Sequence, residues 1–409
     1  MILRFKLPKI NQVRFYAEKV IYAPRDSQPA ELSYNVGESE YVKKILENYS
    51  NKVQYLNTIL KCSEDARRER SKKLIDERKE LIKLLEDKIC TAKSRLISVG
   101  SSATGMLFDQ GSDIDLCFYT EDLNFYKDFE QHRSLRVYVF NKIRHLVYEL
   151  RNIDPDLHVV DAVSLIDTSI PIQILTFKKG VSIDIQVPRE DFQAIRNTNL
   201  VKHYAVADER FSQVYLFIKK LFEVMGLRNS KGGLLSSYHL MMLTIHFLQC
   251  RTLSKPVLPV LCSIIPHRVG PDVPIDKVLK LIDGEFGDYK GDWKSKNNQT
   301  SAELIFEMIN YYRNFFDVNA HQIYISRGLA IKRQLNKNIP TSLQIFDPYS
   351  PTSICRSPYI SDAFATGIRY IFRCMSYGKF IDTFPHFFDA SGFGKYIEDK
   401  PWAFQVKCL

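Results

Sequence analysis

The pattern of apolar and polar positions divides the chain into three regions. Residues 38–93 set single apolar residues among many charged ones, which predicts a helix. Within this stretch Ser63, followed by Glu64 and Asp65, is typical of a helix start, because a hydroxyl cap and early acidic residues satisfy free backbone amides. We expect the dense charges of residues 63–93 to form a solvated face.

The second region is built of short runs rich in Val, Ile and aromatic residues. These runs predict strands of one sheet at residues 96–99, 114–119, 158–165, 170–177 and 181–187. Lys178-Lys179-Gly180 is a short connection of hairpin type between the last two. Residues 126–152 keep one apolar face at helical spacing, so helix and strand alternate in a compact α/β unit.

The third region, from residue 208 onward, is mainly helical. The predicted helices are residues 208–225, 236–249, 275–283, 301–316 and 361–375. Residues 318–349 differ, because 322–325 and 342–346 alternate like short strands around Lys332, Arg333 and Lys337. The fold class predicted is therefore α/β plus α: a mixed-sheet domain followed by a mainly helical one.

Composition excludes several classes of protein. The 409 residues are 45% hydrophobic and 25% charged, which excludes collagen-like, low-complexity and wholly disordered chains. The most apolar helical stretch, residues 234–250, is interrupted by six polar side chains, so we predict no membrane span.

Charge and cysteine usage bear on partners and compartment. The formal charge of +10 favours polyanionic partners, although ordinary solubility would account for it equally. The eight cysteines include no CxxC pair and no zinc-site spacing, which favours a reducing compartment. Residues 1–17 carry four basic residues and no acidic one, as mitochondrial presequences do, but they lack Ser and contain Pro8. We expect a cytoplasmic protein, with mitochondrial and nuclear locations as alternatives.

The most informative segment joins a glycine turn to two aspartates. Gly100 and Ser101 follow an apolar strand, where a glycine allows close approach to a phosphate and a new helix start offers free amides. Asp113 and Asp115 are one residue apart, so the period of a strand places both carboxylates on one face. Mg²⁺ or Mn²⁺ would relieve their repulsion, whereas an EF-hand is excluded because the later acidic ligand is missing. The alternative is a pair of exposed strand aspartates or an Asp-rich turn.

A third carboxylate fits the same face. Asp184 alternates with Ile183 and Ile185 in a later strand. Three carboxylates on neighbouring strands can hold two cations that activate an attacking hydroxyl and stabilise leaving pyrophosphate. The reaction class implied is nucleotidyl transfer, with Asp113, Asp115 and Asp184 as catalytic and metal-binding residues.

Together these residues resemble the DNA polymerase beta-type nucleotidyltransferase superfamily, and the whole chain resembles its non-canonical poly(A) polymerase and terminal uridylyltransferase branch. The resemblance runs from about residue 38 to about residue 375. Further stretches match this branch in order: Asn197-Thr198, Lys219, Ser236-Ser237-Tyr238 and Asp347-Pro348. It implies a nucleotidyltransferase palm domain at residues 60–195, a helical central domain including the poly(A) polymerase-associated region at 38–59 and 196–409, and a basic extension at 1–37.

The resemblance also implies roles for single residues. Gly100 and Ser101 would hold the triphosphate of an ATP or UTP substrate, Asn197 and Thr198 the ribose, and Lys219 and Ser237 the phosphates. Asp347 would be a further nucleotide-binding residue. Tyr238 would stack on the base, and the alternative is a partly buried core tyrosine. His239 and His246, seven residues apart on a mostly apolar helix, are interpreted as core histidines with satisfied hydrogen bonds.

The sequence differs from this branch at two places that bear on nucleotide binding and on the choice of base. Glu223 stands where a second lysine is usual, which removes or inverts one phosphate-binding charge unless Lys202 or Arg210 replaces it. No histidine follows Asp347-Pro348 up to Arg356, where uridylyltransferases of the branch have one. A purine is therefore allowed, and ATP, UTP and mixed incorporation stay open.

The carboxylates do not identify the molecule that accepts the transferred nucleotide, so other features of the sequence bear on it. The basic balance and the match through the helical domain favour an RNA 3′ end, and the sequence has no separate RNA-binding module. Target choice is therefore expected to depend on an RNA-binding partner protein. The alternatives are a scaffold that has lost turnover, with Glu223 as its best support, and a nucleotidyltransferase acting on a non-RNA acceptor.

Overall fold

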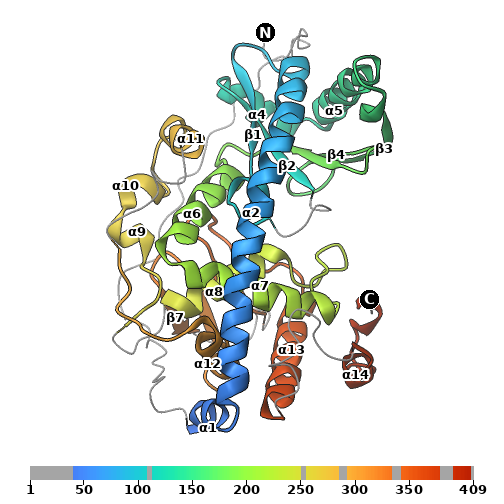
Figure 1. The fold of residues 1–409 in the computed structure, drawn as a ribbon. Helices are drawn as coiled ribbons and strands as arrows, with labels where there is room; N and C mark the ends of the chain where they lie inside the picture. Colours follow the sequence, from blue (N-terminus) through green and yellow to red (C-terminus); the bar gives the residue numbers. More distant parts are fainter. Residues whose placement is uncertain are drawn as a thin grey trace. The chain divides into compact units, whose positions relative to one another are not determined.

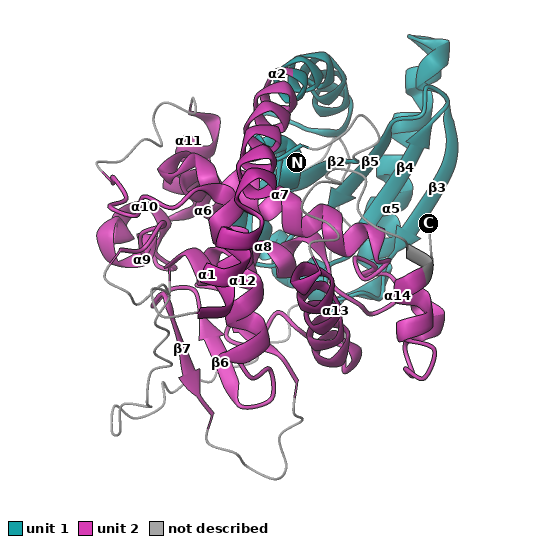
Figure 2. Cartoon of the chain, turned by 60° about the horizontal axis from the view of Figure 1, so that its bottom comes forward, with its two compact units in different colours: residues 1–28, 70–198 teal, residues 29–69, 199–409 magenta. Residues whose placement is uncertain are grey.

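The structure is a computed structural model that describes residues 40–107, 113–249, 255–284, 293–333, 342–377 and 390–406 (Figure 1). These residues form two compact units: unit 1 includes residues 70–198, and unit 2 includes residues 40–69 and 199–406 (Figure 2). The chain passes from one unit to the other within helix α2 (Ser50–Ile89) and within helix α6 (Gln193–Ala207). The predicted domain boundaries stay predictions, and the predicted extension at residues 1–37 lies outside the described residues.

Unit 1 is built on a five-stranded mixed sheet. Its strands are β1 (Ser94–Ser98), β2 (Ile114–Thr120), β3 (Val159–Leu165), β4 (Ile172–Phe177) and β5 (Ser182–Gln186). Their order is β1-β2-β5-β4-β3, and only the central pair β2 and β5 is parallel. The five predicted strands are confirmed as one sheet, and β4 and β5 form the predicted hairpin around Gly180.

Unit 1 also contains helices, besides its parts of α2 and α6. They are α3 (Gly100–Ala103), α4 (Leu123–Gln131), α5 (Arg133–Tyr148), η2 (Glu149–Asn152) and η3 (Pro155–Leu157). The side chain of Asp122 caps α4 by accepting a hydrogen bond from the Asn124 amide. Helix α5 packs on β3 and β4 through an apolar face of Leu135, Val139, Phe140, Ile143 and Val147.

The predicted helix start at Ser63 is wrong. Helix α2 runs without interruption from Ser50 to Ile89, so Ser63 lies in its interior. The helix is held at this point by buried polar contacts within unit 2. Helical propensity and these contacts outweigh the local capping signal.

The prediction that the charges of residues 63–93 are solvated is also wrong in part. Glu64 is only 3% exposed and accepts hydrogen bonds from Arg67, Arg68 and Ser212 at 2.7–2.8 Å. Burial alone would raise the pKa of Glu64, but these hydrogen bonds and the charge of Arg67 lower it below its ordinary value. The Glu64 carboxylate is therefore buried and charged, and its hydrogen bond with Ser212 connects α2 to α7.

Unit 2 is mainly helical. Its helices, besides its parts of α2 and α6, are α1 (Glu40–Asn48), α7 (Glu209–Val224), α8 (Ser237–Gln249), α9 (Leu261–Ile264), α10 (Pro266–Val269), α11 (Ile275–Asp283), α12 (Ser301–Asn314), α13 (Tyr359–Ser376), α14 (Ala390–Tyr396) and η5 (Ala403–Gln405). Helices α7, α8 and α12 pack together and are buried along most of their length. All five predicted helices are confirmed, whereas α6 and the short helices were not predicted.

A small sheet belongs to unit 2. It consists of β6 (His321–Tyr324), β7 (Leu329–Lys332) and β8 (Gln344–Phe346), in the order β7-β6-β8. The two predicted short strands correspond to β6 and β8, while Lys337 lies outside the described residues. Among the described residues, no helix is both long and apolar enough to cross a membrane. The six cysteines in the described ranges are free thiols.

Candidate active site

Two aspartates lie directly opposite each other on the parallel strands of unit 1. In the register of β2 and β5, Asp115 pairs with Asp184, which places their Cα atoms about 5 Å apart. Their strand neighbours Ile114, Leu116, Ile183 and Ile185 are fully buried, so both carboxylates project from the other face of the sheet. Asp113 is exposed and directly precedes β2, two residues from Asp115. The sheet thus pairs two of the predicted carboxylates, and the third lies next to the start of β2.

The pKa of Asp115 reflects the nearby charges of the other two aspartates. Burial, followed by the charges of Asp184 and Asp113, raises the pKa of Asp115 from 3.8 to about 7. The charge of Arg78 acts in the opposite direction. The folded chain therefore concentrates negative charge on a surface that favours a proton or a cation.

Gly100 is packed against one of these carboxylates. Its φ of +67° lies in the left-handed region, and a Cβ built on it would be 2.5 Å from Oδ2 of Asp115. The preceding amide, of Val99, donates to the Asp115 carbonyl at 3.0 Å, which ties the turn to β2. The sequence predicts that Gly100 allows close approach to a phosphate. In this structure the group that lies close to Gly100 is the Asp115 carboxylate.

Ser101 lies in the turn that Gly100 opens. The short helix α3 begins at Gly100, and the hydroxyl of Thr104 donates to the Gly100 carbonyl at 3.0 Å. The Met106 amide donates to the Ser101 carbonyl at 3.1 Å. These bonds fix the backbone around Ser101, while the following residues 108–112 lie outside the described part of the chain.

Helix α6 supplies the two residues predicted for the ribose. The buried Thr198 hydroxyl accepts a hydrogen bond from the Gly100 amide at 3.2 Å and donates to the Ala194 carbonyl at 2.8 Å. Thr198 therefore supports the glycine turn. The Oδ1 atom of Asn197 is buried and has no hydrogen-bond partner among the described residues. An orphaned buried acceptor is the kind of atom that a ligand hydroxyl satisfies, which favours Asn197 as the ribose contact.

Arg78 belongs to the site, although sequence reasoning missed it. Its side chain is buried on α2, and its Nη1 donates to the Ser102 hydroxyl at 3.2 Å. The sequence carries a signal for this burial, because Arg78 precedes the buried Leu81 and Leu85 by three and seven residues and so shares their helix face. A buried arginine beside α3 partly offsets the carboxylate charge.

The donor set of the site fits a hard divalent cation. Three carboxylates supply the oxygen ligands that Mg²⁺ and Mn²⁺ prefer, and Gly100 leaves the space beside Asp115 free of a Cβ. Within the described ranges, no three His, Cys, Asp or Glu side chains already converge as a ready-made metal centre. Small movements of the carboxylates would therefore have to accompany binding, and the metal assignment stays a prediction.

In unit 2 the structure joins two of the predicted nucleotide-binding residues. The Tyr238 hydroxyl donates to Oδ2 of Asp347 at 3.2 Å, although the residues are 109 positions apart. The other oxygen of the buried Asp347 accepts the amides of Tyr349 and Ser350 at 2.9 and 2.7 Å. Burial, with the Asp347 charge, raises the pKa of Tyr238 well above its ordinary value, so the hydroxyl stays a donor.

The first turn of α8 is closed by a reciprocal cap. Ser236 Oγ accepts the His239 amide, and His239 Nδ1 accepts the Ser236 amide, both at 3.1 Å. Ser237 begins the helix between them. His239 Nε2 also contacts the Ile354 carbonyl at 3.1 Å, and His246 Nε2 contacts the Tyr311 hydroxyl at 2.9 Å. The prediction is therefore confirmed for the hydrogen bonds of His239, which is half-buried, whereas His246 is fully buried but its Nδ1 has no hydrogen-bond partner among the described residues.

The structure also shows how the Glu223 departure is accommodated. Glu223 lies one turn after Lys219 on α7 and pairs with Arg228 at 2.7 Å and with Lys220 at 3.7 Å. The suggested replacements have other partners: Arg210 pairs with Asp208 at 2.6 Å, and buried Lys202 donates to the Ile282 carbonyl at 2.9 Å. The inverted charge at position 223 is thus locally neutralised.

Replacing Glu223 with glutamine tests this neutralisation. Because Lys220 and Arg228 would lose their anionic partner, the positive potential around Lys219 rises, and we expect the KM for nucleotide to fall about two- to threefold. Steady-state kinetics at two salt concentrations measures this change, which should shrink as salt increases. An unchanged or higher KM at low salt would contradict it.

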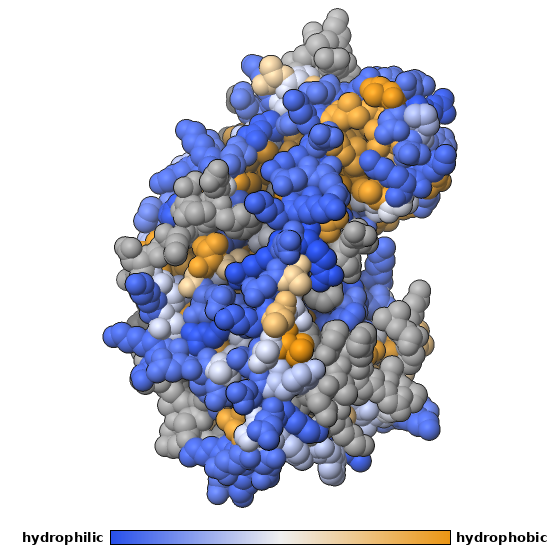
Figure 3. Space-filling view, viewed as in Figure 1, coloured by the Kyte–Doolittle hydropathy of each residue, from blue (hydrophilic) through white to orange (hydrophobic). Residues whose placement is uncertain are grey.

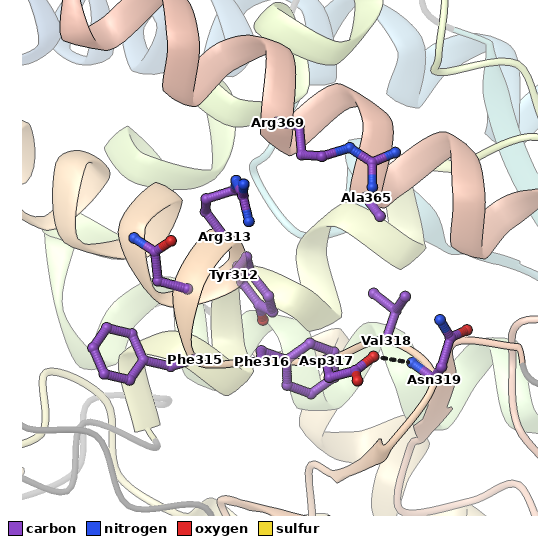
Figure 4. A pocket seen from close by; sticks show the side chains of 10 residues that line it. Tyr312, Arg313, Phe315, Phe316, Asp317, Val318, Asn319, Ala365 and Arg369 are labelled. Carbon is purple, nitrogen blue, oxygen red and sulfur yellow. Dashed lines mark hydrogen bonds between the residues drawn. The ribbon is translucent and has the colours of Figure 1, made fainter.

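A hollow of about 260 Å³ lies elsewhere in unit 2 (Figure 4). It is lined by the end of α12 and the residues after it, 312–319, and by Ala365 and Arg369 of α13. None of the predicted site residues lines it.

The comparisons with known proteins agree with this geometry. Residues 50–206 match the family model described as "Poly(A) RNA polymerase, mitochondrial-like, central palm domain". Poly(A) RNA polymerase GLD2 of Homo sapiens is 28% identical over 242 residues, which cover 59% of this chain and 47% of that protein. Poly(A) RNA polymerase GLD2-A of Xenopus laevis is 25% identical over 386 residues, covering 87% and 70%. The chain spans about half the length of the mammalian relatives it matches.

Solved structures show the same fold. The structure of a GLD-2/RNP-8 complex aligns with a TM-score of 0.58 at 22% identity and covers 83% of this chain and 98% of that chain. Cid1 poly(U) polymerase with Mg and 3′-dATP bound aligns with a TM-score of 0.57 at 20% identity, covering 80% and 94%. The predicted resemblance to the poly(A) polymerase and uridylyltransferase branch and the predicted fold class are both confirmed.

Proposed function

We propose that the chain is a template-independent RNA 3′-terminal nucleotidyltransferase. It adds AMP or UMP, or both, from the nucleoside triphosphate to an RNA 3′-hydroxyl and releases pyrophosphate. The observation that carries this proposal is the row of Asp115 and Asp184 on β2 and β5, with Asp113 beside them and Gly100 packed against Asp115. The similarity to poly(A) RNA polymerases supports RNA as the acceptor.

The reaction follows from what these residues can do. The acceptor 3′-oxygen attacks the α-phosphorus, and the bond to the β-phosphate oxygen breaks. Asp184 accepts a hydrogen bond from the 3′-hydroxyl, holds it in line and takes its proton as the oxygen attacks, while the backbone around Ser101 binds the triphosphate. When bound by the three aspartates, Mg²⁺ or Mn²⁺ supplies the positive charge that stabilises the attacking and leaving oxygens.

Nucleotide binding is assigned to single residues by their chemistry. Asn197 binds the ribose through its orphaned Oδ1, Lys219 and Ser237 bind phosphate, and Tyr238 with Asp347 binds the base. Target choice is assigned to an RNA-binding partner protein, in keeping with the GLD-2/RNP-8 complex among the structural neighbours. We propose the cytoplasm as the compartment.

The sheet itself offers a surface for the acceptor. The row of Asp115 and Asp184 continues through Ile174 on β4 to Val163 on β3. Val163 is 40% exposed on the edge strand. Figure 3 shows hydrophobic surface in this part of unit 1, at its upper right. Strand spacing puts these two side chains about 5 and 10 Å from Asp184, within reach of the last acceptor bases. Aliphatic side chains contact the faces of any base, so this surface is sequence-tolerant.

Replacing Val163 with serine tests this acceptor surface. We expect the KM for RNA to rise about three- to tenfold, because an apolar base contact is lost, while the KM for nucleotide stays unchanged. Val160→Ser is the control, since Val160 is 57% exposed on the same strand but lies at the register shift between Val159 and Asp161, outside the row that leads to Asp184. Equal effects of the two substitutions would contradict an acceptor surface on the carboxylate face.

The proposed function is tested by incubating the purified protein with labelled RNA and ATP, UTP, CTP and GTP, separately and mixed. Extension that disappears in an Asp113→Ala/Asp115→Ala variant supports the proposal, and the preferred nucleotide settles the consequence of the missing histidine after Asp347. Extension only after addition of co-purifying proteins would identify a required partner. An unaltered biological role of the double variant would instead favour the scaffold alternative.

A further inference from the structure

The chain after β8 forms a closed turn, residues 347–356, which we call the turn segment. It begins at Asp347, whose Oδ1 accepts the Tyr349 and Ser350 amides. It returns to β8 at Ile354, whose amide donates to the Ile345 carbonyl at 2.9 Å. The segment is therefore folded back on its own strand and is held at both ends.

Two adjacent residues of α8 hold those same ends. Tyr238 donates to Asp347 at 3.2 Å, at the start of the turn segment. His239 Nε2 contacts the Ile354 carbonyl at 3.1 Å, close to its end. The first turn of α8 thus contacts the turn segment near both of its ends.

The hydrogen bonds of His239 define the state of its ring. Because Nδ1 accepts the Ser236 amide, Nε2 must carry the proton that is donated to Ile354. Burial lowers the pKa of His239, which keeps the ring neutral and in this single tautomer. One imidazole therefore caps α8 and tethers the turn segment at the same time.

We propose that His239 is a positioning residue for nucleotide selection. It fixes the turn segment against the first turn of α8, so that Asp347 and the ring of Tyr238 meet the base at a set distance. The tether ends on a main-chain carbonyl, so it constrains the segment independently of the segment's own side chains, which include no histidine. This inference rests on the proposed function and deepens it.

Two substitutions separate the cap from the tether. In His239→Asn the amide oxygen takes the place of Nδ1 and keeps the cap, but the shorter side chain cannot reach Ile354. In His239→Gln the amide nitrogen falls near the position of Nε2 and can restore the donor to Ile354. We expect His239→Asn to raise the KM for nucleotide about tenfold with kcat within about twofold, as for loss of one partly buried hydrogen bond. The ratio of kcat/KM for ATP and UTP should move toward one, and His239→Gln should recover both parameters.

The control is His246→Asn. His246 is buried on the same helix, bonds Tyr311 and does not contact the turn segment, so its loss should lower Tm with nucleotide KM and ATP-to-UTP ratio unchanged. A His239→Asn variant that lowers Tm but keeps both kinetic parameters of the wild type overturns the inference.

Calorimetric titration of the wild type and the His239 variants with ATP and with UTP distinguishes failure of the proposed function from failure of the proposed role of His239. If the wild type binds a nucleotide but extends no RNA, weaker binding by His239→Asn supports the inference although the proposed function fails. If the wild type extends RNA and all His239 variants match it, only the inference fails. If the wild type binds no nucleotide, both fail.

Discussion

Replacing Asp115 with asparagine is expected to abolish nucleotide transfer and, at the same time, to raise the thermal stability of the protein. Transfer should fall at least about 10³-fold, because the carboxylate that pairs with Asp184 across β2 and β5 is lost. In the wild type, burial and the charges of Asp184 and Asp113 disfavour the ionised Asp115 carboxylate and raise its pKa to about 7. Stability should rise because asparagine carries no charge at this position. Calorimetry should show an increase in Tm of about 2–5 °C at pH 8.

The pH dependence gives the sign of this effect. A folded-state pKa above the ordinary value of 3.8 means that the folded chain binds more protons than the unfolded one between about pH 4 and pH 7. Wild-type stability from this group therefore declines as pH rises through that window and reaches its lowest level above it. The Tm advantage of Asp115→Asn should grow from pH 5 to pH 8.

Added Mg²⁺ gives a second readout of the same site. A cation that binds the carboxylates should raise the Tm of the wild type at pH 8 and have a smaller effect on Asp115→Asn. A variant that is inactive but less stable than the wild type would point to misfolding, and a variant that keeps turnover would remove Asp115 from the catalytic residues.

Replacing Gly100 with alanine is expected to be the second severe change. An added Cβ would lie 2.5 Å from Oδ2 of Asp115, and the φ of +67° disfavours any L side chain. The Asp115 side chain must then move, so we expect transfer to fall at least about 10²-fold and stability to fall by about 1–2 kcal/mol. Extension kinetics and chemical denaturation measure the two effects.

Gly180→Ala provides the matched control. Gly180 also has a positive φ, of +82°, but a Cβ there would meet nothing within 4 Å. The Gly180→Ala variant should lose a similar free energy of unfolding through backbone strain, and it should keep the wild-type kcat. Equal losses of activity in both alanine variants would show that strain, and not the displacement of Asp115, explains the Gly100 effect.

The sheet and its carboxylates could be predicted because strand alternation is a strong local signal. Ile114, Leu116, Ile183 and Ile185 alternate with the aspartates, and a strand with one buried face fixes which side chains share the other face. The sequence could not reveal that Asp115 and Asp184 are exact register partners, since register depends on pairing between distant segments.

Charged residues were the hardest to place from sequence. Glu64 and Arg78 lie in a stretch whose composition is typical of a solvated helix, yet both are buried by partners far along the chain, Ser212 and Ser102. The pairing of Glu223 with Arg228 was missed for a similar reason, because a turn brings residues five positions apart into contact. Such contacts depend on tertiary structure, which no local pattern encodes.

The central claim is that this site joins a nucleotide to an RNA 3′-hydroxyl. The most direct measurement follows one RNA with a free 3′-hydroxyl and the same RNA with a 3′-phosphate, by mass spectrometry of the RNA and quantification of pyrophosphate. The account predicts addition of AMP or UMP residues to the first RNA only, one pyrophosphate for each, and neither product with Asp184→Asn. Nucleotide consumption without RNA extension, or extension that persists in Asp184→Asn, would contradict it.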